Sequence, residues 1–450
     1  MNFKKYIPEY KKTLTLALPV ILAQAGQVFV QMADNVMVGR LGATELAAAA
    51  FGGAIFWNGM VLGIGVSFGL TPIIGQLFVK RGTRRDSAHF FQNSLMLNLL
   101  VGIALTLALW GVSRAFPYMG QEEVVIELAM PYYNYLLLSI VPFMLFNAFR
   151  QFLEGLGNTR VAMWITIGTN VLNIILNYIF IYGNFGAPAM GVAGAGLATF
   201  VSRALMPAAF CVYMLHKNSY RRYFAFFRRE HFSMARVAAL GKMGFPIAMQ
   251  MLMEVTAFSL TAIMMGWFGA VPLAASQIAL QMVTMSFLTV GGIASAATIR
   301  ISHEAGRGDL RAVRRVSTAA YHLTIVYMAT MGGLFVVFRH GIAAAFTPDP
   351  AVIALAVQLL IVGAVFEISD GLQAVTLGML RGIKDVRGPM VVAFFAYIVI
   401  NLPMAYLLAF PLGLGPVGLW AGFVFGLTTA AVLLIRRYRR SLRKMTLARR

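Results

Sequence analysis

The stretch "LALPVILAQAGQVFVQMADNVMVGRLGATELAAAA", residues 16–50, occurs a second time in diverged form. It aligns without gaps with "MGFPIAMQMLMEVTAFSLTAIMMGWFGAVPLAASQ", residues 243–277. Pro19 corresponds to Pro246 and Gly42 to Gly269, and both pairs lie 227 residues apart. A repeat of this length indicates that the chain consists of two related halves.

The same offset returns further along the sequence. "LEGLGNTRVAM" from Leu153 corresponds to "LRGIKDVRGPM" from Leu380, and after a three-residue shift Asn177 corresponds to Asn401. We therefore predict two lobes, residues 1–229 and 230–450, joined by the basic stretch 217–242. Repeats with the same topology are typical of two-lobe transporters whose halves are related by an axis along the membrane normal.

The composition is that of a membrane protein. Hydrophobic residues make up 59% of the 450 and charged residues only 12%, about half the usual charged fraction of soluble domains. About twelve apolar runs are long enough to span a bilayer, each needing roughly 20 residues, and such runs must be helical. We predict an all-α polytopic membrane protein with twelve transmembrane helices in two pseudo-symmetric six-helix lobes. The single cysteine, Cys211, excludes an intrachain disulfide.

The positive charge is distributed unevenly. With this helix assignment, 33 of the 37 Lys and Arg residues lie on one side of the membrane. This asymmetry predicts that both termini are cytoplasmic. The basic N-terminus followed by an apolar run also resembles a signal peptide, but the run continues and recurs later, so we interpret it as the first membrane helix. The net charge of +21 is a weak argument for nucleic-acid binding, because no soluble basic domain is present.

Carboxylates inside apolar spans are the strongest candidates for function. Such residues are costly in lipid and usually face a cavity, although a carboxylate bonded to a neighbouring helix is the structural alternative. In the N-lobe, Asp34 shares a helix face with Gln24, Gln27 and Gln31, since these residues are spaced i, i+3, i+7 and i+10. Asn170, Asn173 and Asn177 form a second polar stripe, which either lines a pocket around Asp34 or joins helices by hydrogen bonds.

The C-lobe has a different set of acidic residues. Glu254 corresponds to Gln27 under the repeat, while Glu367 and Asp370 are three residues apart on one span. A further polar stripe consists of Gln277, Gln281 and Thr284. Clustered carboxylates in a dry site hold either Na⁺ or a proton, and residue type alone does not decide between them. The 27 Met and 34 Phe residues suit a pocket for varied apolar cations.

The repeat, the prolines at 19 and 246, "QMADNVMVGRLG", "LEGLGNTR" and the pair Glu254 and Asp370 together resemble the MATE (multidrug and toxic compound extrusion) family, in its bacterial NorM-type branch. The resemblance covers essentially the whole chain. It implies export of cationic amphipathic compounds in exchange for Na⁺ or H⁺. It also implies an N-lobe site at Asp34, Asn173 and Asn177 and a C-lobe cation site at Glu254 and Asp370, which hold Na⁺ or a proton. The polar and acidic stripes add Gln31 to the expected N-lobe site and Glu367 and Gln281 to the expected C-lobe site.

Two positions depart from the family pattern. Some members have Asp where this chain has Asn177, which weakens a simple proton relay in the N-lobe. Some NorM-type members have Tyr where this chain has Phe366, so that hydroxyl is absent. The loop "GQLFVKRGTRRDSA" from Gly75 also lacks the charged signature of major-facilitator transporters and reads as a basic turn.

We therefore expect a secondary active multidrug efflux transporter in the bacterial inner membrane. The expected protein is a monomer without a cofactor, and its partners are cationic drugs and dyes and membrane lipids. The alternative in the same superfamily is a flippase for a lipid-linked intermediate, which should prefer a cationic cavity for pyrophosphate. An intramembrane enzyme would need metal ligands or a nucleophile with its base. The six histidines lack metal-site spacing.

Overall fold

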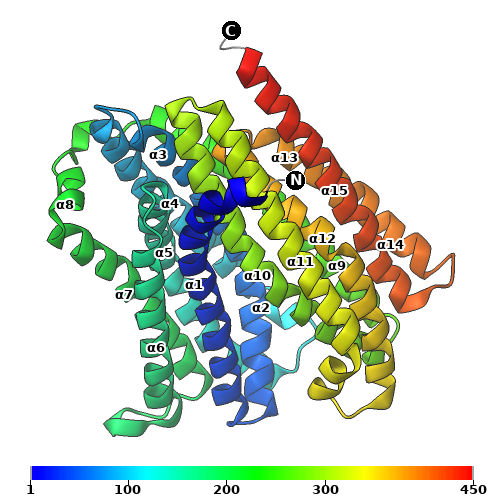
Figure 1. Cartoon of the computed structure of the whole chain (residues 1–450). Coiled ribbons are helices and arrows are strands. Elements are labelled where there is room, and N and C mark those ends of the chain that lie inside the picture. Colours follow the sequence, from blue (N-terminus) through cyan, green and yellow to red (C-terminus); the bar gives the residue numbers. More distant parts are fainter. Residues whose placement is uncertain (1–2, 448–450) are drawn as a thin grey trace. The chain divides into compact units, whose positions relative to one another are not determined.

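The computed structural model describes residues 3–447, and every regular element in this range is helical (Figure 1). The first half contains η1 (Phe3–Tyr6), α1 (Ile7–Gly39), α2 (Ala43–Ser67), α3 (Leu70–Phe78), α4 (Arg84–Ser113), η2 (Phe116–Tyr118), α5 (Glu123–Gly155), α6 (Arg160–Tyr182), η3 (Asn184–Gly186), α7 (Val192–His216), α8 (Asn218–Phe224) and η4 (Arg229–His231). The second half contains α9 (Met234–Gly266), α10 (Ala270–Arg307), α11 (Leu310–Phe346), α12 (Pro350–Gly382), α13 (Arg387–Ala393), the π-helical segment η5 (Phe394–Asn401), α14 (Leu402–Ala409) and α15 (Gly415–Leu447).

Twelve segments of the described chain are long and apolar enough to cross a membrane. Helices α2 and α3 form one of them, Ala43–Phe78, and α13, η5 and α14 form another, Arg387–Ala409. Each of the other ten spans is a single helix. The predicted all-α fold with twelve transmembrane helices is confirmed.

Local sequence signals explain where several helices begin and end. Asp309 and Asp349 precede α11 and α12, and their carboxylates accept hydrogen bonds from Ala312 N at 2.9 Å and Ala351 N at 2.8 Å. These caps satisfy backbone donors that have no partner within the helix. At the C-terminal end of α10, Gly308 has a φ of 82°, a left-handed conformation that glycine adopts without strain.

Contacts group the described chain into two compact units. One contains residues 1–21 and 249–450 and the other contains residues 22–248. These boundaries differ from the predicted lobes because α1 and α9 are continuous helices that each contribute to both units. The change of unit falls after Ile21 in α1 and after Ala248 in α9, again 227 residues apart. The division into lobes at residues 229 and 230 stays a prediction.

The repeat is visible in individual tertiary contacts. In the unit of residues 22–248, Thr71 Oγ1 on α3 donates to the backbone oxygen of Gln151 on α5, at 3.0 Å. In the other unit, Thr298 Oγ1 on α10 donates to Gly378 O on α12, at 2.8 Å. Both residues of the second pair lie 227 positions after those of the first. The sequence repeat therefore encodes the same helix packing twice.

A second contact repeats near the ends of the same helices. A Cβ on Gly155 would lie 2.8 Å from Ile74 Cβ, and a Cβ on Gly382 would lie 3.0 Å from Ile301 Cβ. Any larger residue would push these helices apart, so both positions need glycine. Small residues at helix interfaces are typical of membrane bundles.

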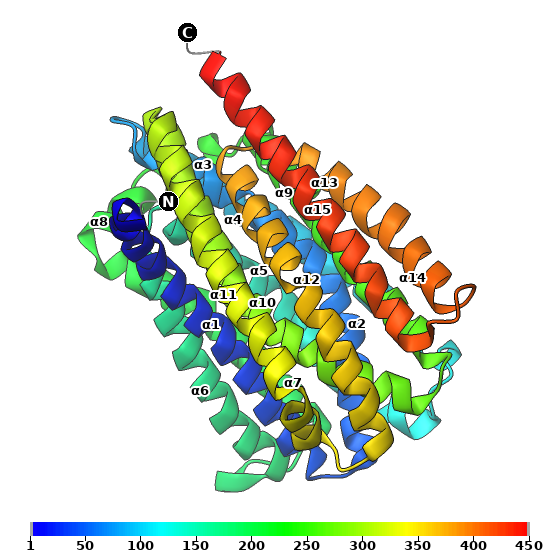
Figure 2. The ribbon, with the colours of Figure 1, turned by 45° about the vertical axis from the view of Figure 1, so that its right-hand side comes forward.

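The core of each unit fills the space between its own helices. In the unit of residues 22–248, the rings of Phe91 and Phe152 stack with centroids 4.2 Å apart. In the other unit, α11, α12 and α15 run side by side (Figure 2), and α10 packs closely on α12.

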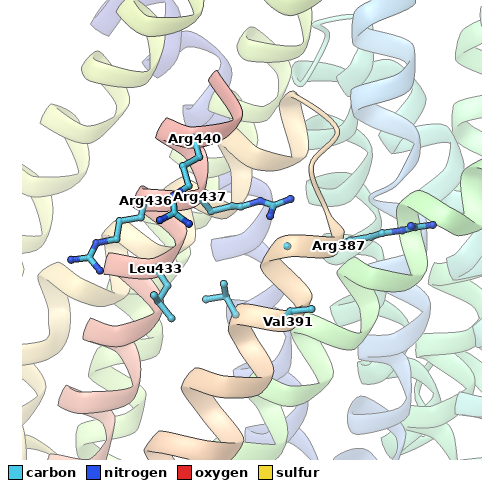
Figure 3. Close-up of a pocket in the computed structure, with 8 residues that line it drawn as sticks. Arg387, Val391, Leu433, Arg436, Arg437 and Arg440 are labelled. Atoms are coloured by element: carbon cyan, nitrogen blue, oxygen red, sulfur yellow. The ribbon is translucent and has the colours of Figure 1, made fainter. Parts of the chain in front are cut away.

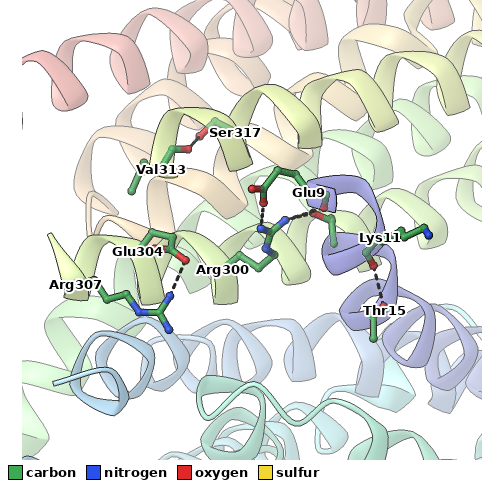
Figure 4. Close-up of polar contacts among 9 residues, drawn as sticks. Glu9, Lys11, Thr15, Arg300, Glu304, Arg307, Val313 and Ser317 are labelled. Atoms are coloured by element: carbon green, nitrogen blue, oxygen red, sulfur yellow. Dashed lines mark hydrogen bonds and ion pairs between the residues drawn. The ribbon is translucent and has the colours of Figure 1, made fainter. Parts of the chain in front are cut away.

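The first turns of α1 are tied to α10 by a buried arginine. Arg300 NH1 donates to Glu9 O at 2.8 Å and to Thr13 Oγ1 at 2.7 Å, and a second guanidinium nitrogen pairs with the Glu9 carboxylate (Figure 4). Because breaking a buried ion pair leaves an uncompensated charge, this contact fixes the start of the chain against a helix almost 300 residues further along.

Candidate functional site

The N-lobe site is built where side chains of α1 and α6 meet. Gly26 allows this approach, since a Cβ there would lie 3.1 Å from Asn170 Nδ2. One turn beyond Asp34, Tyr182 OH donates to Met37 O at 2.8 Å. Asp34, on the partly buried side of α1, is thereby held opposite the predicted asparagine stripe.

The stripe and the carboxylate are directly bonded. The side-chain amide of Asn177 donates to Asp34 Oδ1 and also to Asn173 Oδ1, the latter at 3.1 Å. The Oδ1 atom of Asn177 is buried and has no hydrogen-bond partner in the described chain, so it is available to a donor. The structure thus brings together three of the four residues predicted for this site, with Asn177 as a donor to the carboxylate.

Arg203 supplies a positive charge in the same unit. Its guanidinium donates to Ser139 Oγ at 2.9 Å and lies 5.0 Å and 4.9 Å from the ring centroids of Phe56 and Phe143. It interacts electrostatically with Asp34. Asp34 therefore has a counter-charge inside the protein.

In the C-lobe, two glutamines hold the predicted carboxylates. Gln250 Nε2 and Gln373 Nε2 each donate to Glu254 at 3.0 Å, one to each carboxylate oxygen. Gln373 Nε2 also lies 3.4 Å from Asp370 Oδ1. The amide of Gln373 therefore bridges Glu254 on α9 and Asp370 on α12.

Arg381 completes this hydrogen-bonded group. It is one of the 33 Lys and Arg residues counted on one side of the membrane, and it lies near the end of the span of α12, Pro350–Gly382. Its NH2 donates to Gln250 Oε1 at 2.9 Å, and it interacts electrostatically with Glu254. The guanidinium is therefore directed towards the acidic group.

Glu367 is the third carboxylate of this group and is completely buried. Ser286 Oγ lies 2.8 and 2.9 Å from its two carboxylate oxygens, so α10 holds it against α12. Glu367 and Glu254 both interact electrostatically with Asp370. Three carboxylates therefore share one environment with a single guanidinium, that of Arg381.

A tyrosine hydroxyl faces the same group from η5. Tyr397 is 1% exposed, it interacts electrostatically with Glu254 and Asp370, and its hydroxyl makes no hydrogen bond of good geometry within the described residues. Asn401, one turn on, is also buried, and neither polar atom of its side chain has a hydrogen-bond partner among the described residues. Since π-helical turns are rare and often mark functional positions, η5 is a candidate part of this site.

Two predicted residues stand apart from these clusters. Gln31 and Gln281 have exposed side chains, and neither is hydrogen-bonded to the acidic residues in the part of the chain that the structure describes. Their roles stay predictions. A group of three or more His, Cys, Asp and Glu side chains that could hold a metal ion is not found among the described residues.

Sequence reasoning missed Gln250, Gln373, Arg381, Tyr397 and Arg203 as site residues. Spacing carried the signal for two of them. Gln250 precedes Glu254 by four residues and Gln373 follows Asp370 by three, which puts each pair on one helix face. The position of Tyr397 depends on the π-helical turn of η5, which could not be predicted from the sequence.

Comparison with known families agrees with this geometry. The model of the MatE family matches the chain twice, over residues 19–179 and 246–407. The chain belongs to the MatE family. The two matches begin 227 residues apart, at Pro19 and Pro246, so the family unit coincides with the repeat found in the sequence. The predicted resemblance to MATE transporters is confirmed.

Relatives of similar length carry transporter names. The chain is 35% identical over 438 residues to "Probable multidrug resistance protein NorM" of Mesorhizobium japonicum, covering 96% of this chain and 94% of the relative. It is also 35% identical over 445 residues to a protein of the same name from Rhizobium meliloti, covering 98% and 95%. This MatE protein is an integral multi-pass membrane transporter, and an enzymatic activity is not indicated by its family.

Solved structures share the fold at lower identity. A transporter of the MOP superfamily from Pyrococcus furiosus has a TM-score of 0.87 at 22% identity, covering 97% of both chains. The MATE transporter VcmN of Vibrio cholerae, in a form described as bent, has a TM-score of 0.86 at 17% identity, covering 99% of both chains. These similarities concern the fold of the MatE chain.

Proposed function

We propose that this MatE protein is a secondary active multidrug efflux transporter that exports cationic amphipathic compounds from the cytoplasm in exchange for Na⁺ or H⁺. Both termini are then cytoplasmic, as the distribution of Lys and Arg predicts. Asp34 binds the substrate cation, and the C-lobe group of Glu254, Glu367 and Asp370 binds the coupling ion.

The unequal charge of the two acidic sites is the observation that carries this assignment. Asp34 is paired electrostatically with Arg203, so the N-lobe site is close to neutral. The C-lobe group has three carboxylates and one guanidinium, so it is negative by two charges when all are ionised. Because uncompensated charge in a dry interior is costly, the C-lobe must take up small cations, either protons or Na⁺.

The donor set of the C-lobe fits a small hard cation. Carboxylate oxygens, amide oxygens and hydroxyls are the ligands that such cations prefer. Glu254 and Asp370 supply carboxylate oxygens, and Tyr397 supplies a hydroxyl from η5, whereas the chain has Phe366 where some family members have Tyr. These residues would hold the ion, while Gln250 and Gln373 fix the carboxylates in position.

The N-lobe site suits a bulkier organic cation. Asp34 remains partly exposed on α1, and Phe56 and Phe143 hold the competing guanidinium of Arg203 by cation–π contacts. A substrate cation replaces Arg203 as the positive charge that interacts with the Asp34 carboxylate. Antiport then requires that ion and substrate favour different states of the transporter, which is a coupling free energy between the two sites.

The decisive experiment is dye export from proteoliposomes under separately imposed Na⁺ and H⁺ gradients. Wild type, Asp34→Asn and Glu254→Gln are compared with an ethidium-type fluorescent cation. We expect Glu254→Gln to abolish gradient-driven export while dye binding in detergent is kept, and Asp34→Asn to weaken dye binding at least tenfold. Export by Glu254→Gln at the wild-type rate under either gradient would contradict the assignment of the ion to the C-lobe.

A further inference from the structure

A basic cavity lies between α13 and α15, and its lining contains none of the residues of the acidic sites. Its volume is about 470 Å³, and it is lined by Arg387, Gly388, Val391, Val392, Leu433, Arg436, Arg437 and Arg440. The residues from α15 are spaced i, i+3, i+4 and i+7 from Leu433, so they share one helix face. Figure 3 shows Arg436, Arg437 and Arg440 projecting from neighbouring turns of α15, while the side chain of Arg387 runs from α13 in the direction away from α15.

One of the four arginines is already paired. Arg437 makes two hydrogen bonds to the Asp385 carboxylate, at 2.8 and 3.1 Å, and Ser441 Oγ donates to the same carboxylate at 2.6 Å. This network joins the loop before α13 to α15 and fixes the back of the cavity. Arg387, Arg436 and Arg440 have no ion pair within residues 3–447. Three guanidinium groups at the cavity are therefore uncompensated.

The remaining wall of the cavity is apolar and continues onto a lipid-facing surface. Val391 is 49% exposed, and Phe394 and Phe395, one turn further along the span, are 43% and 49% exposed. The span begins at Arg387, so the arginines lie where the apolar part of the helices ends. A ligand in this cavity meets positive charge at one end and hydrocarbon-like side chains at the other.

We propose that this cavity binds a phosphate ester, and that the ester is the headgroup of an anionic phospholipid in the adjacent leaflet. Arg436 and Arg440 contact the phosphate oxygens, for which planar guanidinium groups are well suited. Leu433 and Val391 contact the first methylene groups of the acyl chains. Basic pockets between membrane helices on the positively charged side are known to suit lipid headgroups. The site is independent of the transport cycle proposed above.

Topology alone does not require this arrangement. The positive-inside rule needs only that Lys and Arg be numerous on one side of the membrane, and dispersed residues satisfy it. Here arginines about fifty positions apart in the sequence line the same cavity. Three of the six basic residues of α15, Arg436, Arg437 and Arg440, line this cavity, while Arg439, Arg443 and Lys444 lie outside its lining.

Native mass spectrometry of the full-length protein in detergent tests the proposal. The protein is titrated with phosphatidylglycerol, with phosphatidylcholine of the same acyl chains, and with inorganic phosphate as a competitor. The variant Arg436→Gln/Arg440→Gln removes two unpaired charges from the cavity. Arg439→Gln/Arg443→Gln, on the same helix but outside the lining, removes the same number of charges and serves as the matched control.

We expect wild type and control to retain one phosphatidylglycerol, and the cavity variant to bind it about 30-fold more weakly, equivalent to about 2 kcal/mol at 1.4 kcal/mol per tenfold change. Equal loss in the control would show nonspecific charge attraction and would overturn the site. Equal retention of phosphatidylcholine would overturn the requirement for an anionic lipid. Displacement of the lipid by millimolar phosphate would overturn the lipid as the source of the ester. Size-exclusion profiles and the single variant Arg440→Gln, for which we expect an intermediate affinity, exclude misfolding as the cause.

Discussion

Asn177 donates a hydrogen bond from its side-chain amide to Asp34, and this bond joins α6 to α1. A charge-assisted hydrogen bond contributes about 1.5–3 kcal/mol, so Asn177→Ala should lower the affinity for a cationic dye about tenfold through loss of the carboxylate's position. Dye binding to purified protein, followed by fluorescence anisotropy, measures this change. Asn170→Ala is the matched control on the same helix, because the Asn170 amide nitrogen has no hydrogen-bond partner in the described chain. Equal effects of both variants would contradict a specific role for Asn177.

The bridging amide of Gln373 predicts a change in ion affinity. Its donor group faces both Glu254 and Asp370, and loss of that donor makes the ionised carboxylates less favourable. Protons then compete better with Na⁺, so Gln373→Ala should raise the Na⁺ concentration for half-maximal dye export about tenfold at neutral pH, which corresponds to about 1.4 kcal/mol. Gln277→Ala, on the exposed side of α10, should leave this concentration unchanged. An unchanged Na⁺ concentration for half-maximal export in Gln373→Ala would show that Gln373 does not contribute to ion binding.

The Tyr397 hydroxyl, which interacts with Glu254 and Asp370, leads to a prediction that distinguishes a ligand from a packing residue. Tyr397→Phe keeps the ring that fills the core and removes only the oxygen. We expect about tenfold weaker Na⁺ binding, measured by isothermal titration calorimetry in detergent, with a melting temperature within about two degrees of wild type. Tyr406→Phe, at an exposed position of the same span, is the control. Undiminished Na⁺ binding in Tyr397→Phe would exclude the hydroxyl as a ligand.

The repeated threonine contact predicts effects on stability in both units. Thr71→Val and Thr298→Val each remove the buried hydroxyl that bonds to a backbone oxygen of a facing helix, at a cost of about 1 kcal/mol. Thr71→Val also removes a bond to Gln151 Oε1 at 2.5 Å. Both variants should therefore lower the free energy of unfolding in denaturant titrations, Thr71→Val by somewhat more, and the double variant should lose about the sum because the two contacts belong to different units. The control is Thr330→Val. The Thr330 hydroxyl bonds only to Val326 O on the same helix, at an exposed position, so its loss should cost less than half as much free energy.

The Asp385 network predicts a dependence of stability on pH. Burial opposes ionisation of this carboxyl, but the hydrogen bonds from Arg437 and Ser441 outweigh it and hold the pKa of Asp385 below its ordinary value. A lowered pKa in the folded state stabilises the protein above the unfolded value of about 3.9, and this contribution is lost as the pH falls through the lower folded value.

Asp385→Asn should therefore reduce stability by about 1 kcal/mol at pH 7, since the pair is partly solvent-exposed. The difference from wild type should stay constant down to about pH 4 and shrink only below it. Thermal melting across this range, with Asp349→Asn as a control at an exposed helix cap, measures it. A difference that disappears already between pH 7 and pH 5 would contradict the lowered pKa.

Much of the fold could be predicted from the sequence because membrane constraints are simple. Apolar length gives the twelve spans, and the pair Pro19 and Pro246 gives the repeat that the threonine contacts later display. The pairing of Asp34 with Asn177 could be predicted from two polar stripes, since in lipid such stripes must face each other or a cavity.

The rest depended on features that residue order does not encode directly. Arg381 was counted only as one of the positive charges on one side of the membrane, and only the tertiary position of Gln250 shows that its guanidinium turns towards the acidic group. Tyr397 faces the carboxylates because η5 is π-helical, which shifts side chains relative to an ordinary helix. Gln31 and Gln281 were predicted as site residues from helix periodicity alone. Periodicity gives the helix face on which a residue lies, but not what lies opposite that face.

The ion pair between Arg300 and Glu9 has a consequence for folding during synthesis. Glu9 is synthesised long before Arg300, although both residues belong to the same unit, which also contains residues 249–450. At about 5–20 residues per second, the wait for α10 is on the order of 15–60 s, during which the first helix must remain inserted with its Glu9 unpaired. Residues 22–248 are complete much earlier and can assemble while synthesis continues. The unit that contains α10 is therefore completed only when α10 packs against the beginning of α1. Truncation before α10 should leave the beginning of α1 accessible to protease.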